Sequence, residues 1–199
     1  MQLQKLHKIV GIALTIPLLA WALTGIIFLT KPGYSGAYER LPVKTYPLEQ
    51  TFAPALAGQW HEAKLLRTVL GYHLLLKGPQ GQLHLDPRTL QKRPTPTDAE
   101  LTRLVTDAIR LNPQRYGDLS HINNGQAFTD SNVEIALDWQ TLSLSQSGSD
   151  TRLINTLYKI HYLQWLGEKT ANTVFGALGI FLLLCLVVLG VMNSRNRGA

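Results

Sequence analysis

Two long uncharged stretches lie near opposite ends of the chain, with a polar and patterned region between them. The first runs from Ile9 to Leu29 and the second from Val174 to Met192. At about 1.5 Å rise per residue, a helix over the first stretch is roughly 31 Å long, which matches the hydrocarbon core of a bilayer. The pattern predicts transmembrane helices over residues 9–30 and 173–192, with short tails at 1–8 and 193–199.

Shorter patterns predict that residues 31–150 form an α+β domain, an antiparallel sheet plus helices. Several segments alternate between apolar and polar residues, as strands with one buried face do. The predicted strands are 62–69, 72–77, 82–86, 133–139 and a hairpin partner around 142–144. Thr97-Asp98-Ala99-Glu100 is a capping box, and apolar residues at helical spacing follow it as far as Asn112-Pro113. This segment is the clearest soluble helix in the sequence.

The other parts of the middle region give weaker patterns. Residues 48–57 predict a short helix, and the Gly-, Asp- and Asn-rich segment before Val133 predicts a loop. Ser145 to Ser149 has the composition of a polar linker. Residues 151–172 are amphipathic and rich in aromatic side chains, which predicts an interfacial helix that bends or continues into the membrane near Asn172.

The domain also contains an internal sequence repeat. Leu83 to Leu90 (LHLDPRTL) matches Ile135 to Leu142 (IALDWQTL), so that Asp86 aligns with Asp138 and each is followed three residues later by a threonine. Aspartate and threonine both hydrogen-bond local backbone in turns, which is sufficient reason for them to recur. The repeat predicts two similar strand–turn–strand units and a structural role for these aspartates.

The basic residues indicate how the chain crosses the membrane. It has 19 Lys and Arg against 13 Asp and Glu, a net charge of +6. Four basic residues occupy the two tails, which have no acidic residue: Lys5, Lys8, Arg195 and Arg197. Because Lys and Arg near a span resist translocation, both termini are predicted to be cytoplasmic and the domain to lie outside. No small-residue cleavage site precedes Lys31, so the first span is predicted to be an uncleaved anchor.

Composition and motifs exclude several classes of function. The middle region keeps 15 of the 19 basic residues and all 13 acidic ones, a balance unlike that of a nucleic-acid-binding surface. The one cysteine, Cys185, lies in the second span, and the sequence has no glycine-rich phosphate loop. His61-Glu62 lacks the second histidine of a zinc-protease helix, and Ser120-His121 lacks a nucleophile elbow. A hydrolytic or nucleotide-using enzyme is therefore not expected.

One face of the first span is suited to close helix packing. Gly11, Leu14, Leu18 and Gly25 share this face, and small residues let membrane helices approach one another. Similar glycines recur in the second span. The lipid bilayer is one predicted partner of the spans. This face predicts another, which is either the second span or a second copy of the chain. A second copy would give a homodimer through the transmembrane helices.

Four motifs along the chain resemble those of the PepSY-associated transmembrane proteins. They are Leu6-His7-Lys8 followed by Gly11, Leu23-Thr24-Gly25, the twice-used Leu-Asp-x-x-Thr, and Ile160-His161-x-x-x-Trp165-Leu166-Gly167. The resemblance covers nearly the whole length and implies a PepSY-like domain in the periplasm, on the outer side of a bacterial inner membrane. Larger relatives have four or more spans and include proteins linked to siderophore-iron uptake, some with haem in the membrane. PepSY modules elsewhere occur in protease propeptides and are thought to bind or restrain peptidases.

Two histidines are candidate haem ligands. His7 lies at the inner end of the first span and His161 near the outer end of the second. An imidazole in such a place ligates haem iron when a second group holds its other nitrogen. In a twofold dimer each histidine would meet its mate, giving two bis-histidine haems and an electron path across the membrane. In the alternative, His7 is an interfacial residue and His161 packs on Trp165.

A second pair of histidines belongs to the domain. His73 and His84 fall on the same face of adjacent predicted strands, where they are a candidate cross-strand metal pair. More often such residues are simply solvated.

Two kinds of function remain open. In the first, the protein is a binding, regulatory or accessory module whose domain engages a periplasmic protein or peptide, with the spans as its anchor. In the second, it is a haem-dependent membrane reductase, or a subunit of one, that supports iron reduction. The sequence favours the first, and with it a protein that is not an enzyme.

Overall fold

The computed structural model describes residues 2–50, 52 and 58–195, and the chain divides into two compact units. One unit comprises Met1–Tyr34 with Arg152–Ala199, and the other comprises Ser35–Thr151. Most of the helix predicted over residues 48–57 lies outside the described residues. The described part of that segment, residues 48–50 and 52, is not helical.

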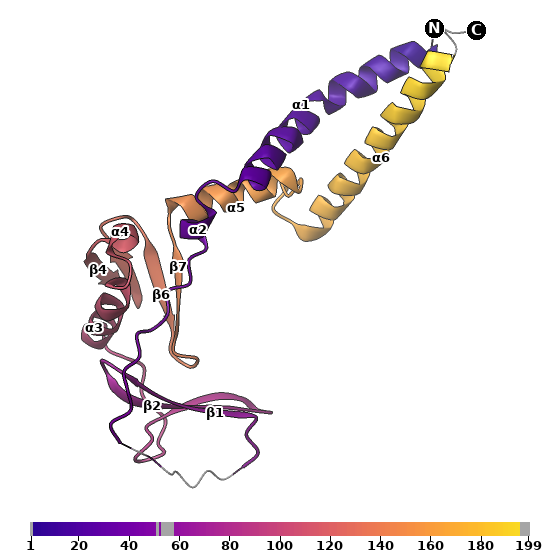
Figure 1. The fold of residues 1–199 in the computed structure, drawn as a ribbon. Helices are drawn as coiled ribbons and strands as arrows, with labels where there is room; N and C mark the ends of the chain where they lie inside the picture. Colours follow the sequence, from indigo (N-terminus) through magenta and orange to yellow (C-terminus); the bar gives the residue numbers. More distant parts are fainter. Residues whose placement is uncertain (1, 51, 53–57, 196–199) are drawn as a thin grey trace. The chain divides into compact units, whose positions relative to one another are not determined.

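The first unit is built on two long helices, α1 (Gln2–Thr30) and α6 (Lys169–Arg195), which pack against each other in antiparallel order (Figure 1). Both are long and apolar enough to cross a membrane. The predicted packing face of α1 meets α6, since a Cβ added at Gly11 would lie 3.6 Å from Leu186 Cδ1. Leu14 on the same face is 6% exposed, whereas most large apolar side chains of both helices point outward. These outward faces suit a lipid environment.

A third helix, α5 (Ser149–His161), precedes α6 but is not continuous with it. The chain adopts left-handed backbone at Leu163 (φ 54°) and Gly167 (φ 70°), which ends the helix and turns the chain. The Glu168 carboxylate then accepts hydrogen bonds from the amides of Thr170 and Ala171 at 2.8 and 2.6 Å, and this begins α6. The predicted single interfacial helix over 151–172 is therefore wrong in its second half.

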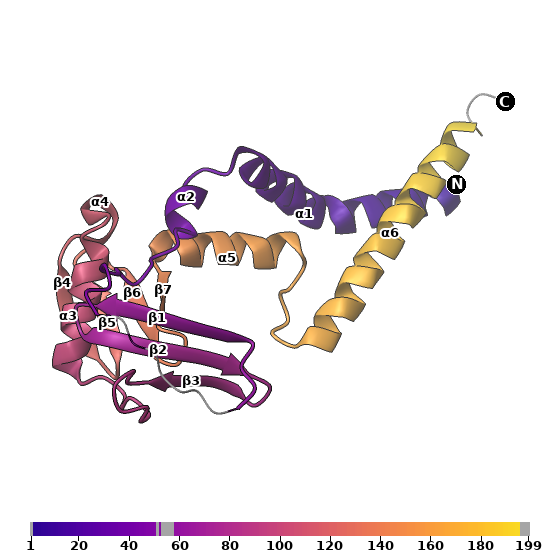
Figure 2. The ribbon, with the colours of Figure 1, turned by 60° about the horizontal axis from the view of Figure 1, so that its bottom comes forward.

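The second unit contains two antiparallel sheets (Figure 2). The first has the order β1-β2-β3 and the second the order β4-β5-β6-β7. The strands are β1 Glu62–Thr68, β2 Gly71–Gly78, β3 Gly81–Leu85, β4 Leu119–Asn123, β5 Gln126–Thr129, β6 Glu134–Asp138 and β7 Ser143–Ser147. Each sheet is a simple meander, so every strand pairs with its neighbour in sequence. The predicted α+β domain between two membrane helices is confirmed.

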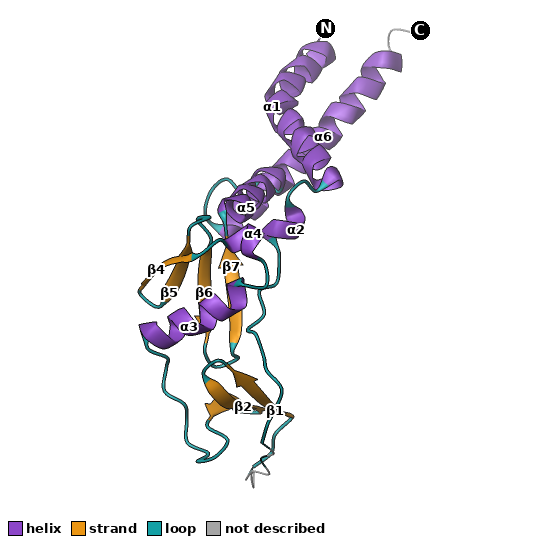
Figure 3. Cartoon of the chain, turned by 60° about the vertical axis from the view of Figure 1, so that its left-hand side comes forward, coloured by secondary structure: helices purple, strands orange, loops and turns teal. Residues whose placement is uncertain are grey.

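The main core lies between the four-stranded sheet and α3 (Asp98–Ile109) (Figure 3). The predicted capping box starts this helix, with the Thr97 hydroxyl accepting from Glu100 N and the Glu100 carboxylate accepting from Thr97 N. Val105 and Ala108 of the helix are fully buried, as is Ile135 of β6. A smaller core around Leu74, Leu76 and Leu85 belongs to the three-stranded sheet.

Two segments predicted as loop or linker are ordered elements. The predicted loop before Val133 contains the short helix α4 (Pro113–Tyr116) and the β4–β5 hairpin. Asn124 and Gly125 turn this hairpin with φ of 49° and 74°, which is the Asn-Gly signature of a tight hairpin. The predicted polar linker is mostly β7, whose serines sit on an edge strand and need no apolar face. The predicted hairpin partner around 142–144 is the start of β7, and polarity concealed the rest of that strand and the β4–β5 hairpin from hydrophobic patterning.

The two copies of the sequence repeat form the same local turn. Asp86 accepts from the amides two and three residues ahead at 2.8 and 3.3 Å, and Asp138 does the same at 3.0 and 3.3 Å. Leu90 and Leu142 close the turns in left-handed conformation, with φ of 58° and 50°. These aspartates therefore cap turns. The likeness is local, because one copy leads out of a three-stranded sheet and the other lies within a four-stranded one.

Candidate functional sites

His161 lies against α1 within a group of aromatic side chains. Its ring stacks on Trp21 with the centroids 5.5 Å apart and meets the edge of Phe28 at 4.9 Å. The expected alternative contact with Trp165 is not made, because Trp165 packs on Phe175 and donates to the carbonyl of Ile160. The glycine at position 25 gives His161 room, since a Cβ there would lie 3.9 Å from its Cε1.

A hydrogen bond fixes the orientation of this imidazole. Thr24 Oγ1 lies 2.8 Å from His161 Nδ1, and the same hydroxyl donates to the carbonyls of Ala20 and Trp21 at 2.7 and 3.0 Å. A hydroxyl has one hydrogen, so when Thr24 donates to a carbonyl its oxygen is left to accept, and Nδ1 of His161 then carries the donated proton. The remaining nitrogen, Nε2, then holds a lone pair and has no hydrogen-bond partner within the described chain. This is the arrangement in which histidines ligate metals.

His7 lies against the other end of the helix pair. A Cβ added at Gly190 of α6 would be 3.4 Å from His7 Cε1, so the glycine makes space for the ring. His7 Nδ1 is buried and has no hydrogen-bond partner within the described chain. Burying a polar nitrogen without a partner is unfavourable, and this nitrogen is available to bond an added group. His7 and Thr24 stand about 26 Å apart along α1, so the two candidate histidines do not share a ligand in one copy.

His73 and His84 are brought together, but in a sealed position. They are 0% and 2% exposed, which overturns the expectation that they are solvated. Nδ1 of His73 lies 2.8 Å from Nε2 of His84, and Nδ1 of His84 lies 2.6 Å from the carbonyl of Trp139. Nε2 of His73 lies 2.8 Å from the Thr68 hydroxyl. All four ring nitrogens are therefore engaged.

These contacts determine the direction of each hydrogen bond in the neutral pair. The carbonyl of Trp139 only accepts, so Nδ1 of His84 donates to it and Nε2 of His84 must accept. His73 then donates from Nδ1 and accepts at Nε2 from the hydroxyl of Thr68. The chain of bonds runs from Thr68 through both imidazoles to the loop that follows β6, and so joins the two sheets.

The surroundings keep both imidazoles uncharged. Burial, and then the charges of Arg93 and His84, lower the pKa of His73 from 6.5 to about 3. Burial also lowers the pKa of His84, although its bond to the carbonyl of Trp139 acts in the opposite direction. Among the described residues, no group of three or more His, Cys, Asp or Glu side chains is placed to hold a metal ion. A metal on this pair would have to break the direct bond between the rings, so the geometry favours a structural link.

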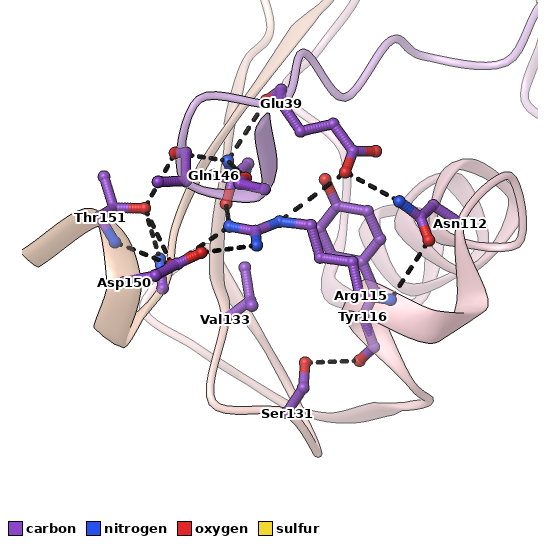
Figure 4. A network of polar contacts seen from close by, with 12 residues as sticks. Glu39, Asn112, Arg115, Tyr116, Ser131, Val133, Gln146, Asp150 and Thr151 are labelled. Atoms are coloured by element: carbon purple, nitrogen blue, oxygen red, sulfur yellow. Dashed lines mark hydrogen bonds and ion pairs between the residues drawn. The ribbon is translucent and has the colours of Figure 1, made fainter. Parts of the chain in front are cut away.

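The sequence patterns did not single out a third cluster, which is centred on Arg115 of α4 (Figure 4). Its guanidinium donates to Asp150 Oδ2 at 2.8 Å and to Gln146 Oε1 at 2.7 Å. The Gln146 amide in turn donates to the carbonyls of Ala37 and Glu39 at 3.1 and 3.2 Å. Arg115 therefore links the segment that follows α1 to the segment that leads through α5 towards α6. We call these contacts the Arg115 clamp.

Further contacts close the Arg115 clamp. The Thr151 hydroxyl donates to the carbonyl of Ala37 at 3.0 Å, and the Asn112 amide donates to Glu39 Oε2 at 2.8 Å. The hydrogen bond from Arg115 lowers the pKa of Asp150, so this carboxylate is charged at neutral pH. Gly36 allows the close approach, since a Cβ there would be 2.8 Å from Arg115 Nη1. The partners are far apart in sequence, which explains why pattern alone could not find them.

A comparison with protein families matches residues 4–197 to the PepSY-associated TM region. The chain belongs to this family. The match spans both membrane helices and the whole domain between them, so the two helices that the fold presents as candidate spans are membrane helices of a PepSY-associated protein. Searches of curated proteins and of solved structures found no match.

Proposed function

We propose that this PepSY-associated protein is an accessory module of the bacterial inner membrane. In this proposal both termini are cytoplasmic, and residues 35–151 act in the periplasm on a protein or peptide partner, in support of siderophore-iron uptake. The Arg115 clamp is the observation that carries the proposal. It joins the two ends of the domain, from which the chain continues towards the spans, so the domain is stabilised as one folded unit with a membrane anchor at each end. Such a body suits a module that presents a binding surface.

Other features agree with this role. The buried histidine pair is occupied by structural hydrogen bonds. Basic residues in both tails favour cytoplasmic termini. The connection with siderophore iron follows from the resemblance to larger family members.

Cysteine labelling in intact cells tests the location. The background is Cys185→Ala. Gln126→Cys places a thiol at the exposed first residue of β5, beside the hairpin turn, and Ser194→Cys places one near the end of α6. A membrane-impermeant maleimide is expected to label position 126 once the outer membrane is permeabilised, and position 194 only after the inner membrane is lysed. The reverse pattern would refute the proposed orientation.

Affinity purification of the full chain from crosslinked cells tests the binding role. Wild type is expected to carry an envelope protein or peptide that the Arg115→Met variant carries at reduced yield, because loosening the Arg115 clamp loosens the presented domain. Growth on a ferric siderophore as sole iron source tests the pathway in cells that lack the gene. If the folded wild-type chain captures no envelope partner and its loss leaves growth unchanged, the accessory role is wrong.

A second function, haem binding, is favoured by the ring nitrogens of His7 and His161. His161 donates from Nδ1 to Thr24 and leaves Nε2 with a lone pair, while His7 Nδ1 is buried without a partner. Haem bound by these residues would supply one-electron transfer. Each histidine lacks a second histidine at its own level in one copy, so this function requires a homodimer. In that homodimer Thr24 would hold the proton on Nδ1 of His161. Gly25 leaves room for the imidazole of His161, and Gly190 leaves room for that of His7.

An absorption spectrum of the detergent-purified full chain tests this function. A Soret band that is lost in His161→Ala and in His7→Ala, but kept in His121→Ala on exposed β4, is the expected result. Thr24→Val removes the hydroxyl at nearly constant volume, and is expected to shift or weaken the band by freeing the imidazole. A wild-type sample without a Soret band after haem supplementation would eliminate haem and leave the accessory role intact.

A further inference from the structure

Arg93 is the half-buried arginine of the domain that lacks an acidic partner. The domain has three half-buried arginines, and two of them form ion pairs, Arg67 with Glu49 and Arg115 with Asp150. Arg93 instead donates to the carbonyls of Tyr72 and Leu70, at 2.6 and 3.2 Å. These bonds hold the guanidinium in place and leave its charge uncompensated by any described carboxylate at ion-pair distance.

The nearby acids are already used elsewhere. The Asp86 carboxylate accepts from two amides of its own turn, and the Glu100 carboxylate accepts from the amide and hydroxyl of Thr97. Both hold positions in their own elements, and neither forms an ion pair with Arg93 among the described residues. A half-buried cation without a counter-charge is costly unless water or an anion approaches it.

Arg93 also lines a hollow of about 370 Å³. Its walls are Lys92, Arg93, Pro94, Thr95, Trp139 and Gln140. Two cations and no acid line it, and the ammonium group of Lys92 has no partner within the described chain. Thr95 and Gln140 add a hydroxyl and an amide. The hollow is therefore electropositive and has spare hydrogen-bond donors.

The indole of Trp139 gives the hollow an apolar wall. The ring packs against His84, with the two centroids 4.3 Å apart, and the Arg93 guanidinium lies over the indole at 5.9 Å from its centroid. A fixed aromatic wall next to two cations suits a ligand with a carboxylate and an adjoining flat or apolar group.

We propose that the hollow bounded by Lys92, Arg93 and Trp139 binds a carboxylate attached to an apolar or aromatic group. The free carboxyl end of a peptide with an apolar last residue has this chemistry, and so does a small aryl carboxylic acid. The carboxylate pairs with Arg93 and Lys92, and the apolar group packs on Trp139. The inference gives a ligand class to the accessory role proposed above.

Calorimetric titration of the full chain in lipid nanodiscs tests the proposal. The probes are 3-phenylpropanoate and its uncharged amide, together with a tripeptide ending in phenylalanine in its free-acid and amidated forms. The two acids are expected to bind and the two neutral forms to bind at least tenfold more weakly, with affinity falling as salt is raised. Binding of only the small acid, or only the peptide acid, would show which source the site accepts.

Matched variants separate the site from the fold. Lys92→Gln removes a charge that makes no contact in the described chain, so folding should be unchanged while acid binding weakens about tenfold or more. Arg93→Gln should abolish binding, and Arg110→Gln at the exposed C-cap of α3 should leave it unchanged. Equal binding of acid and amide, no binding by wild type, or unchanged binding in Lys92→Gln and Arg93→Gln would overturn the proposal. None of these results bears on the cysteine labelling that tests the location.

Discussion

His73 donates a hydrogen bond from Nδ1 to Nε2 of His84 at 2.8 Å, inside the domain and shielded from solvent. The pair continues to the Thr68 hydroxyl on one side and to the Trp139 carbonyl on the other. Since β2 and β3 carry the histidines and Trp139 follows β6, this single chain of bonds ties one sheet to the other. Protonation of His84 at Nε2 would place two N–H donors face to face and break the bond between the rings.

The first prediction is that acid loosens the three-stranded sheet. The pKa of His73 is lowered from 6.5 to about 3, so opening the sheet takes up a proton at any pH between these values. Stability is full above about pH 6.5 and is lost as the pH falls, by about 1.4 kcal/mol per pH unit for each histidine that titrates. Arg93 opposes protonation and Asp86 favours it weakly.

Hydrogen exchange measured by mass spectrometry on the full chain between pH 7 and 4 checks this prediction. After correction for intrinsic exchange rates, protection of β2 and β3 is expected to fall about tenfold per pH unit below 6.5. His61→Gln changes an exposed histidine and should leave the effect intact, whereas His73→Gln should reduce it. Protection of β2 and β3 that does not depend on pH would contradict the inference.

A second prediction concerns the Arg115 clamp. Arg115→Met keeps much of the side-chain volume but leaves Asp150 and Gln146 without their donor, which should destabilise the domain by about 1.5–3 kcal/mol. Thermal unfolding of the full chain followed by circular dichroism measures the loss. The matched control is Arg110→Met, at an exposed position without a partner in the described chain, and its change should stay within about 0.5 kcal/mol. Similar losses in both variants would show that the clamp contributes little.

A third prediction follows from the glycine beside the clamp. In Gly36→Ala the new methyl group would lie 2.8 Å from Arg115 Nη1, so the guanidinium must move away from Asp150. We expect a loss of about 1–3 kcal/mol, as for other overpacked sites. The loss should not add to that of Arg115→Met, because the guanidinium is already absent there. Ser35→Ala, one residue earlier and exposed, is the control, and fully additive losses would argue against the contact.

A fourth prediction concerns the start of α3. Thr97→Ala removes the hydroxyl side of the capping box, because Glu100 N loses its acceptor and the Glu100 carboxylate loses one donor, while the backbone amide of residue 97 still donates to that carboxylate. The helix end should lose about 1 kcal/mol of stability. Hydrogen exchange measures this loss as reduced protection of the amides in the first turn of α3. Thr102→Ala, an exposed threonine in the same helix, should be neutral or slightly stabilising because alanine favours helix. Equal protection in the two variants would mean that the cap does not hold the helix end.

Regular patterns made much of the fold predictable. The uncharged stretches gave α1 and α6, a loosely apolar segment gave β1, alternation gave β2, β3 and β6, and the capping box gave α3 at the correct residue. Each of these signals is repeated over several residues and depends only on local periodicity. The hairpin of β4 and β5 carried a local signal too, since Asn124-Gly125 is a tight-turn dipeptide, but its strands are too polar to show alternation.

The sequence alone determined that two apolar helices flank a polar α+β domain, because burial in lipid and burial in a core each impose a period on neighbouring residues. It also identified His7, His161, His73 and His84 as residues of interest, but could not assign their environments. Only the tertiary structure decided that His161 donates to Thr24, that His73 and His84 are sealed together, and that Arg115 joins the two ends of the domain. These contacts join residues far apart in the chain, and a hydrogen bond depends on where two atoms meet after folding, which local periodicity does not encode.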